Sequence, residues 1–183
     1  TLRRRMRQGA EPTPEVKKLL SEANEAFVRN DLQVAMDLYL AIVKLDNKNF
    51  PAYKTLGEIY KMQGNFNKCS NFWLLAAHLH PWDYEFWRML AELSVKLGHM
   101  RQALYCYSKA IKASHNRDYA SIFDRAILYR EKAQYKRAAE SFQKLRQALP
   151  TETKVIRELA MVYVEQNRIN DAISMYCNIL EDN

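Results

Sequence analysis

A period of 34 residues runs through the chain and constrains its fold more than any other feature. Small residues recur at intervals of 34, 34, 35 and 34 positions, at Ala23, Gly57, Ala91, Ala126 and Ala160. A second column of small residues follows twelve positions later, at Ala35, Cys69, Ala103, Ala138 and Ala172. Four positions further stands an aromatic column, made of Tyr39, Trp73, Tyr107, Phe142 and Tyr176. Self-similarity at such a period is typical of stacked helical repeats.

Each copy of the period is predicted to form two antiparallel helices joined by a tight turn. The small residues let neighbouring helices approach closely, and the aromatic residue fills the space between them. The turn column holds residues that tolerate the left-handed conformation at a helix C-terminus, namely Asn30, Gly64, Gly98 and Asn167. Ala133 takes this position in the fourth copy, where we expect the turn to be made differently or under slight strain. Pro81 and Pro150 are expected to stop the second helix.

Composition favours helix over strand. The chain has only 4 Gly and 5 Pro in 183 residues, which leaves little material for the turns of a β protein. Residues that favour helix, such as Ala, Leu, Lys and Glu, are plentiful. No run of eighteen apolar residues occurs, so we expect no membrane span. The predicted fold class is all-α.

The positions of the columns resemble the tetratricopeptide repeat. Small residues stand at positions eight and twenty of each unit, an aromatic at twenty-four and often Pro at thirty-two. The resemblance implies a superhelix, an α-solenoid of helix hairpins. Five units are expected, at residues 16–49, 50–83, 84–118, 119–152 and 153–183. We expect the array to continue beyond residue 183.

The N-terminal segment differs from the rest of the chain in its charge. Of the formal net charge of +7, a large share lies near the start, where four arginines face Glu11 alone among residues 1–14. Residues 1–15 are expected to form a basic, flexible arm. Because arginines neutralise phosphates, the candidate nucleic-acid contacts are Arg3, Arg4, Arg5 and Arg7.

No pattern that carries catalysis is present in the sequence. We find no nucleophile with its base, no phosphate-cradling glycine loop and no set of metal ligands at a known spacing. His78 and His80 stand two positions apart, which points them to different faces of a helix. We therefore expect no enzymatic activity, no cofactor and no metal site.

Partner binding is expected on the first helix of each unit, because these helices line the concave wall of such arrays. The candidate groove residues are Lys54, Glu58, Lys61, Arg88, Glu92, Lys96, Phe123, Ile127, Arg130 and Arg157. Their basic excess and apolar members suit an acidic partner segment with hydrophobic anchors. The alternative is that individual members are only solvated helix faces. Charge reversal at Arg88 and Lys54 is expected to weaken partner binding without unfolding the array.

Longer strings, partly outside the repeat columns, carry a second and narrower resemblance. They are LLSEANEAFVRNDLQVA (19–35), NFPAYKTLGEIYKMQG (49–64), AAHLHPWDYEFWRMLAELS (76–94), RQALYCYSKAI (101–111) and VIRELAMVYVEQNRINDAI (155–173). These strings resemble the family of tetratricopeptide subunits of transcription factor IIIC, in its fungal version. Such subunits are much longer, which implies that this chain is a part of one.

The resemblance implies a nuclear, non-catalytic scaffold of the RNA polymerase III system. Its implied partners are the other subunits of transcription factor IIIC and two components of transcription factor IIIB, the TFIIB-related factor and Bdp. It further implies a role in promoter recognition at transfer-RNA genes, with DNA reached mainly through the complex. Two alternatives stay open: a direct DNA contribution from the basic arm, and a generic tetratricopeptide adaptor of another nuclear complex.

Overall fold

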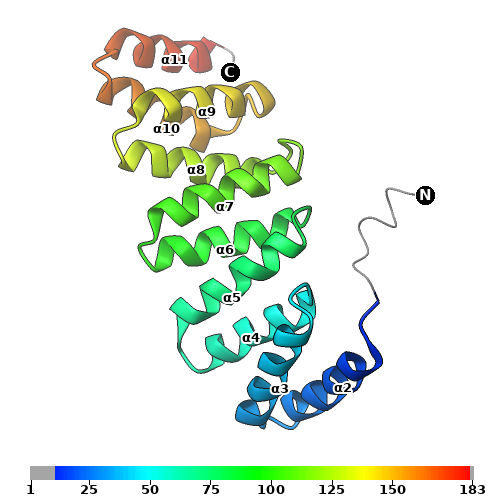
Figure 1. Ribbon diagram of the computed structural model, residues 1–183. Coiled ribbons are helices and arrows are strands. Elements are labelled where there is room, and N and C mark those ends of the chain that lie inside the picture. Colours follow the sequence, from blue (N-terminus) through cyan, green and yellow to red (C-terminus); the bar gives the residue numbers. More distant parts are fainter. Residues whose placement is uncertain (1–10, 182–183) are drawn as a thin grey trace, which may run out of the picture. The chain divides into compact units, whose positions relative to one another are not determined.

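The computed structural model describes residues 11–181, of which residues 178–181 are described by their backbone alone. This range contains ten α-helices and no β-strand, which confirms the all-α prediction (Figure 1). The helices are α2 (Pro14–Val28), α3 (Leu32–Leu45), α4 (Phe50–Met62), α5 (Phe66–Leu79), α6 (Tyr84–Lys96), α7 (Met100–Ala113), α8 (Tyr119–Glu131), α9 (Tyr135–Ala148), α10 (Thr153–Glu165) and α11 (Ile169–Glu181). None of these helices is long and apolar enough to cross a membrane.

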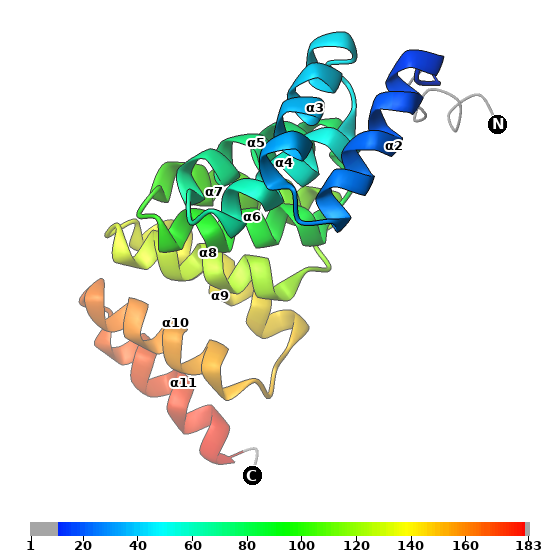
Figure 2. The same ribbon diagram turned by 90° about the horizontal axis from the view of Figure 1, so that it is seen from below.

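The chain divides into two compact units, with the boundary between Pro81 and Trp82. In the first unit α2 packs on α3, α3 on α4, and α4 on α5. In the second unit each helix from α6 to α11 packs on the next one along the chain, and α8 also touches α10. Figure 2 shows α10 and α11 lying side by side as one such hairpin. Each unit is therefore a stack of helix hairpins.

The repeat columns form the core of both units. The first small-residue column is buried, since Ala23, Ala91 and Ala126 are 0% exposed and Ala160 is 2% exposed. The second column and the first four aromatics are buried as well. Tyr176 differs, with an exposed fraction of 45%, because α11 has its main packing partner, α10, on one side only.

Gly57 lies where α4 and α5 approach each other closely. A Cβ atom at this position would lie 2.1 Å from Cδ1 of Trp73, well inside van der Waals contact. The indole Nε1 of Trp73 donates to the backbone oxygen of Lys54 at 3.1 Å, which fixes the ring against α4. The small residue of this hairpin is therefore glycine because its aromatic residue is the largest of the column.

The turn column adopts the left-handed conformation that the sequence predicts. The φ angles are 65° at Asn30, 75° at Gly64, 73° at Gly98 and 59° at Asn167. Ala133 has a φ of 54°, so the fourth hairpin makes the same turn with a residue that bears a Cβ. Of the two expectations for this turn, slight strain describes the structure, because the left-handed region costs a non-glycine residue about 1–2 kcal/mol.

The interval of 35 residues adds one residue to the third copy, and the loop between α7 and α8 at the end of this copy is ordered by a network of hydrogen bonds. Ser114 Oγ donates to the backbone oxygen of Ile111 at 3.0 Å and accepts from the N–H of Asp118 at 3.1 Å. Two successive residues, His115 and Asn116, have positive φ angles of 55° and 62°. The loop therefore delivers Asp118 to the first turn of α8 in a defined position.

The first helix begins at Pro14, within the segment expected to be an arm. The side-chain oxygen of Thr13 caps it by accepting from the N–H of Val16 at 3.4 Å, and Pro14 suits the first helical position. Arg3, Arg4, Arg5 and Arg7 lie outside the described residues, so their contact with nucleic acid stays a prediction.

Candidate partner-binding surface

The ten candidate groove residues all lie on first helices of the hairpins. In the first unit, α4 carries Lys54, Glu58 and Lys61; in the second, α6, α8 and α10 carry Arg88, Glu92, Lys96, Phe123, Ile127, Arg130 and Arg157. Their side chains differ sharply in what they contact, and these contacts separate structural residues from free ones.

Arg130 connects α8 to α10. Its guanidinium forms an ion pair with the carboxylate of Glu158, a residue that is 8% exposed, and its Nη1 lies 3.6 Å from Sδ of Met161. Arg157 approaches the other oxygen of the same carboxylate at 3.6 Å. Breaking such a pair leaves a buried charge uncompensated, so Arg130 stabilises the stacking of two hairpins. Its availability to a partner is correspondingly small.

Arg88 is also paired with carboxylates of the fold. Its Nη1 lies 3.0 Å from Oδ1 of Asp118, whose side chain is 2% exposed, and its Nε lies 4.0 Å from Glu92. Asp118 also accepts from the N–H of Ser121 at 3.3 Å and from its hydroxyl at 2.5 Å, and so caps α8. Reversing the charge at Arg88 would place a carboxylate against a buried one. We therefore correct the expectation that this change leaves the fold intact.

Asp124 is a further carboxylate, on α8 itself. Tyr107 donates its hydroxyl to Oδ2 of Asp124 at 3.4 Å. Burial raises the pKa of Asp124, and the nearby charges of Glu92 and Asp118 raise it further, while Arg88 lowers it. Burial also raises the pKa of the Tyr107 hydroxyl. The first-helix face of α6 and α8 therefore carries both positive and negative charges, and Arg88 lies close to several of the acidic groups.

The two apolar candidates belong partly to the core. Phe123 and Ile127 are half-buried and pack against the buried cluster of α7 to α11, and Phe123 meets Phe142 edge-on with ring centroids 5.6 Å apart. Phe123 also lines a hollow of about 460 Å³ between α8 and α10, together with Asp124, Lys154 and Val155. A hollow of this size is within the range that takes a large side chain of a partner.

In the first unit, Trp73 contacts two of the candidate residues, through the backbone oxygen of Lys54 and the ammonium of Lys61. Lys61 places its ammonium 5.5 Å from the centroid of the indole ring, while Lys54 is exposed. Glu58 is half-buried, and its charge adds to burial in raising the pKa of Cys69 to about 11. Among residues 11–177, no carboxylate lies within 4.0 Å of the ammonium groups of Lys54, Lys61 and Lys96. The cations open to a partner on these helices are therefore the lysines.

Glu158 and Asp118 were missed by sequence reasoning. Asp124 and Glu158 occupy the sixth position of their units, beside the groove positions, and this repeated acidic residue was a usable signal. Asp118 gave another signal, because an aspartate directly before a helix is a preferred N-cap.

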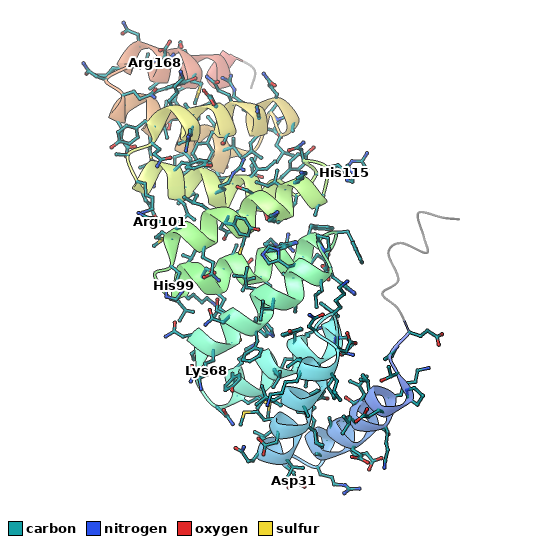
Figure 3. The ribbon with its side chains drawn as sticks, viewed as in Figure 1. Asp31, Lys68, His99, Arg101, His115 and Arg168 are labelled. Carbon is teal, nitrogen blue, oxygen red and sulfur yellow. The ribbon has the colours of Figure 1, made fainter. Side chains whose placement is uncertain are left out.

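The histidines do not gather into a site. His80 stacks on Phe50 with ring centroids 3.9 Å apart, and Figure 3 shows His99 and His115 at the two ends of α7. No group of three or more His, Cys, Asp or Glu that could hold a metal ion occurs within the described part of the chain.

Comparison with known proteins gives close relatives by sequence, although no family model matches the chain. It is 48% identical over 170 residues to the transcription factor tau 131 kDa subunit of Saccharomyces cerevisiae, an alignment that covers 93% of this chain and 16% of the relative. Over the aligned segment, the chain is a homologue of this transcription factor IIIC subunit. Schizosaccharomyces pombe transcription factor tau subunit sfc4 is 37% identical over 164 residues, covering 84% of this chain and 16% of the relative. Human general transcription factor 3C polypeptide 3 is 31% identical over 162 residues, covering 86% and 18%.

The resemblance of the five strings to the transcription factor IIIC subunits is thus confirmed. The chain spans about a sixth of the length of these relatives, given that 16% to 18% of each is covered.

Solved structures confirm the tetratricopeptide fold. The crystal structure of the MamA protein superimposes with a TM-score of 0.62 at 16% sequence identity, over 91% of this chain and 90% of that one. YrrB, described as a TPR protein with an unusual peptide-binding site, superimposes with a TM-score of 0.61 at 19% identity, over 86% and 80%. At these identities the likeness concerns the fold alone.

Proposed function

We propose that this chain is a segment of the tetratricopeptide subunit of transcription factor IIIC and acts there as a non-catalytic scaffold in the nucleus. The observation that carries the proposal is the 48% identity to the tau 131 kDa subunit across 93% of the chain. In this role it holds other subunits of transcription factor IIIC and recruits transcription factor IIIB at transfer-RNA genes, through the TFIIB-related factor and Bdp.

The contacts of the first helices support protein binding by these faces. Tetratricopeptide arrays use these helices to hold segments of other proteins. Lys54 and Lys96 are exposed and have no carboxylate within 4.0 Å among the described residues, so they are open to acidic groups of a partner. The hollow beside Phe123 offers a seat for a hydrophobic side chain, and its lining carries Lys154 together with the acidic Asp124 and Glu152. A partner segment with a hydrophobic anchor suits the hollow, and acidic groups elsewhere in the segment suit Lys54 and Lys96.

The test uses two exposed lysines on first helices and two matched lysines on second helices. The first variant carries Lys54→Glu and Lys96→Glu, and the control carries Lys44→Glu and Lys112→Glu, which lie on α3 and α7 and are exposed as well. Both variants have the same net charge. Arg88 and Arg130 are left unchanged because their ion pairs hold the fold.

Binding is measured with the 183-residue chain against purified TFIIB-related factor and against purified Bdp. We expect the first variant to bind at least one of them about tenfold more weakly, because like charges then face each other, and the control to stay within about twofold. Equal affinities of the two variants would reject recruitment through the first-helix faces, as would a wild-type chain that binds neither protein.

The basic arm is tested separately by deleting residues 1–14. Arginine contacts to phosphate make DNA binding weaken steeply with salt. Loss of promoter-DNA binding together with unchanged recruitment of transcription factor IIIB would assign the arm an accessory electrostatic role. Loss of recruitment itself would favour the alternative in which direct DNA binding is central.

A further inference from the structure

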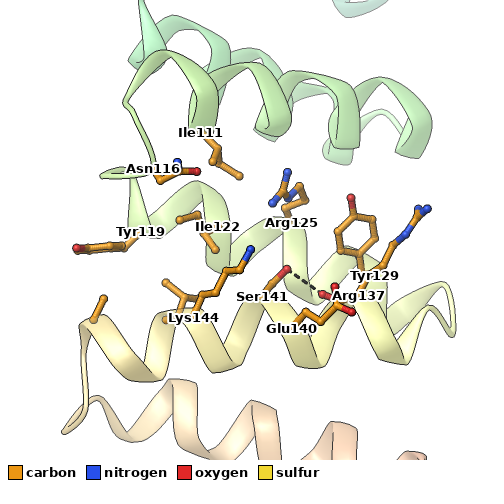
Figure 4. A pocket seen from close by; sticks show the side chains of 12 residues that line it. Ile111, Asn116, Tyr119, Ile122, Arg125, Tyr129, Arg137, Glu140, Ser141 and Lys144 are labelled. Carbon is orange, nitrogen blue, oxygen red and sulfur yellow. Dashed lines mark hydrogen bonds between the residues drawn. The ribbon is translucent and has the colours of Figure 1, made fainter.

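The second unit has another hollow, of about 530 Å³, on α8 and α9 beneath the end of α7 (Figure 4). On α8 it is lined by Tyr119, Ile122, Arg125 and Tyr129. Arg125 stands two positions after the candidate groove residue Phe123, and Tyr129 stands two positions after Ile127. Residues two apart on a helix are separated by a rotation of about 200° around the helix axis, so they point to nearly opposite sides. Arg125 and Tyr129 therefore face away from the side of α8 that carries Phe123 and Ile127.

The rim of this hollow is basic. Arg125, Arg137 and Lys144 line it, against Glu140 as the single acidic side chain of the lining. Within the described range, none of the three cations has a carboxylate oxygen within 4.0 Å. This distinguishes them from Arg88 and Arg130, whose charges are matched inside the fold.

Tyr129 organises the two guanidinium groups. The guanidinium carbons of Arg125 and Arg137 lie 5.7 Å and 5.8 Å from the centroid of its ring, and Figure 4 shows the ring between them. Arg125 also donates through Nη1 to the hydroxyl of Ser108 on α7 at 3.1 Å. Its Nε–H is buried and has no acceptor among residues 11–177. A buried donor without an acceptor is unfavourable.

The lower part of the hollow is apolar. Ile111, Ile122 and Leu145 contribute to its lining and are 5%, 8% and 1% exposed. Tyr119 contributes a further ring. The phosphates of a nucleic acid would pair with the cations of the rim, but nothing in its backbone would pack on an aliphatic floor. An acidic protein segment with a hydrophobic side chain would make both kinds of contact.

We propose that this hollow is a second docking site, which takes an acidic protein segment by seating one large hydrophobic side chain on the apolar floor. The carboxylates that flank this side chain then pair with Arg125, Arg137 and Lys144. The cation–π contacts with the ring of Tyr129 restrict the guanidinium groups before binding, which lowers the entropy cost of the contact. Arg125 and Tyr129 lie on a different side of α8 from Phe123, while Tyr119 and Leu145 line both this hollow and the hollow beside Phe123. Binding at this site requires neither Lys54 nor Lys96.

The test measures binding of labelled peptides to the 183-residue chain by fluorescence anisotropy. The probe is a short peptide of Asp and Glu with one central Phe, and its partner has Ser in place of Phe at the same net charge. We expect the Phe peptide to bind and the Ser peptide to bind about tenfold more weakly, since burial of the ring is lost.

Matched variants locate the site. Arg137→Glu with Lys144→Glu reverses the rim, whereas Lys132→Glu with Lys136→Glu makes the same change of net charge outside the hollow; all four residues are exposed. We expect about a tenfold loss of peptide affinity in the first variant and less than about twofold in the second. Circular dichroism checks that both variants remain folded.

Four outcomes would overturn the proposal. They are no binding of the Phe peptide to the wild-type chain, equal binding of the Ser peptide, equal loss in both double variants, and binding of a single-stranded oligonucleotide of equal charge with the same dependence on Arg137 and Lys144. The variant with Lys54→Glu and Lys96→Glu should bind the peptide normally, so a failure of the groove and a failure of this site are distinguishable.

Discussion

Replacing Gly57 by alanine tests whether the repeat columns are matched to one another by volume. The added Cβ would lie 2.1 Å from Cδ1 and 2.3 Å from Nε1 of Trp73, where ordinary contact begins at 3.4 Å. The ring must therefore retreat by about 1.3 Å, the difference between 3.4 Å and 2.1 Å, although Trp73 is only 5% exposed.

The expected cost follows from three effects. Overpacking of a core costs about 1–3 kcal/mol. Displacement of the ring also weakens the hydrogen bond from Nε1 to the backbone oxygen of Lys54, which contributes about 1 kcal/mol. The helix propensity of alanine returns about 1 kcal/mol. We expect Gly57→Ala to lower the free energy of unfolding by about 2 kcal/mol.

A double-mutant cycle with Trp73→Leu isolates the steric effect. In the leucine background the ring is absent, so Gly57→Ala is expected to be neutral or to stabilise by up to about 1 kcal/mol. The measurement is urea unfolding followed by circular dichroism, with hydrogen exchange of the α4 and α5 amides as a local readout, because stacked repeats unfold in parts. A stabilising Gly57→Ala in the wild-type background, or a coupling energy near zero, would refute the reasoning.

Three further changes test the turn, the buried carboxylate and the ion pair, each through the urea midpoint. Ala133→Gly should raise the free energy of unfolding by about 0.5–1 kcal/mol by relieving the left-handed strain, with a smaller gain for Asn167→Gly; a loss at Ala133 would contradict the strain. Asp124→Asn should stabilise the chain at neutral pH, because a raised folded-state pKa means that the folded state holds the ionised carboxyl at a cost. This gain should vanish as the pH falls through that raised pKa toward 3.8, and a gain that persists in acid would exclude the ionisation as its cause. Arg88→Met should lower the free energy of unfolding by about 2 kcal/mol, which is less than for a fully buried ion pair because Arg88 is partly exposed. The loss should be clearly smaller in an Asp118→Asn background, where the negative charge is absent. Equal losses in both backgrounds would exclude the ion pair as the cause.

The fold could be predicted because its determinants recur along the chain. Ala91 and Ala126 are interpretable as helix contacts only when aligned with Ala23 and Ala160, and all four are buried as the alignment requires. The pairing of Gly57 with a tryptophan is also visible in the sequence, since the other copies combine Ala with Tyr or Phe.

The sequence could not predict in the same way which candidate binding residues are already paired within the fold. The register places Arg88 and Arg130 correctly on first helices, but their partners Asp118 and Glu158 stand 30 and 28 residues further on. A period of 34 residues specifies the face of a helix that a side chain occupies. It does not specify which carboxylate a long, flexible guanidinium reaches, because that depends on the spacing of neighbouring hairpins.

Arginine and lysine side chains have different roles in this chain, and the difference follows from their chemistry. The guanidinium is planar and weakly hydrated, which suits ion pairs that are partly removed from water, and Arg88 and Arg130 fill this role against carboxylates that are 2% and 10% exposed in their side chains. Lys54 and Lys96 keep compact, strongly hydrated charges at the surface. Arg125 and Arg137 differ from both groups, because they make cation–π contacts with Tyr129 yet have no carboxylate within 4.0 Å among the described residues. Arginines prepared in this way without a counter-ion are what a recognition site for an anionic partner requires.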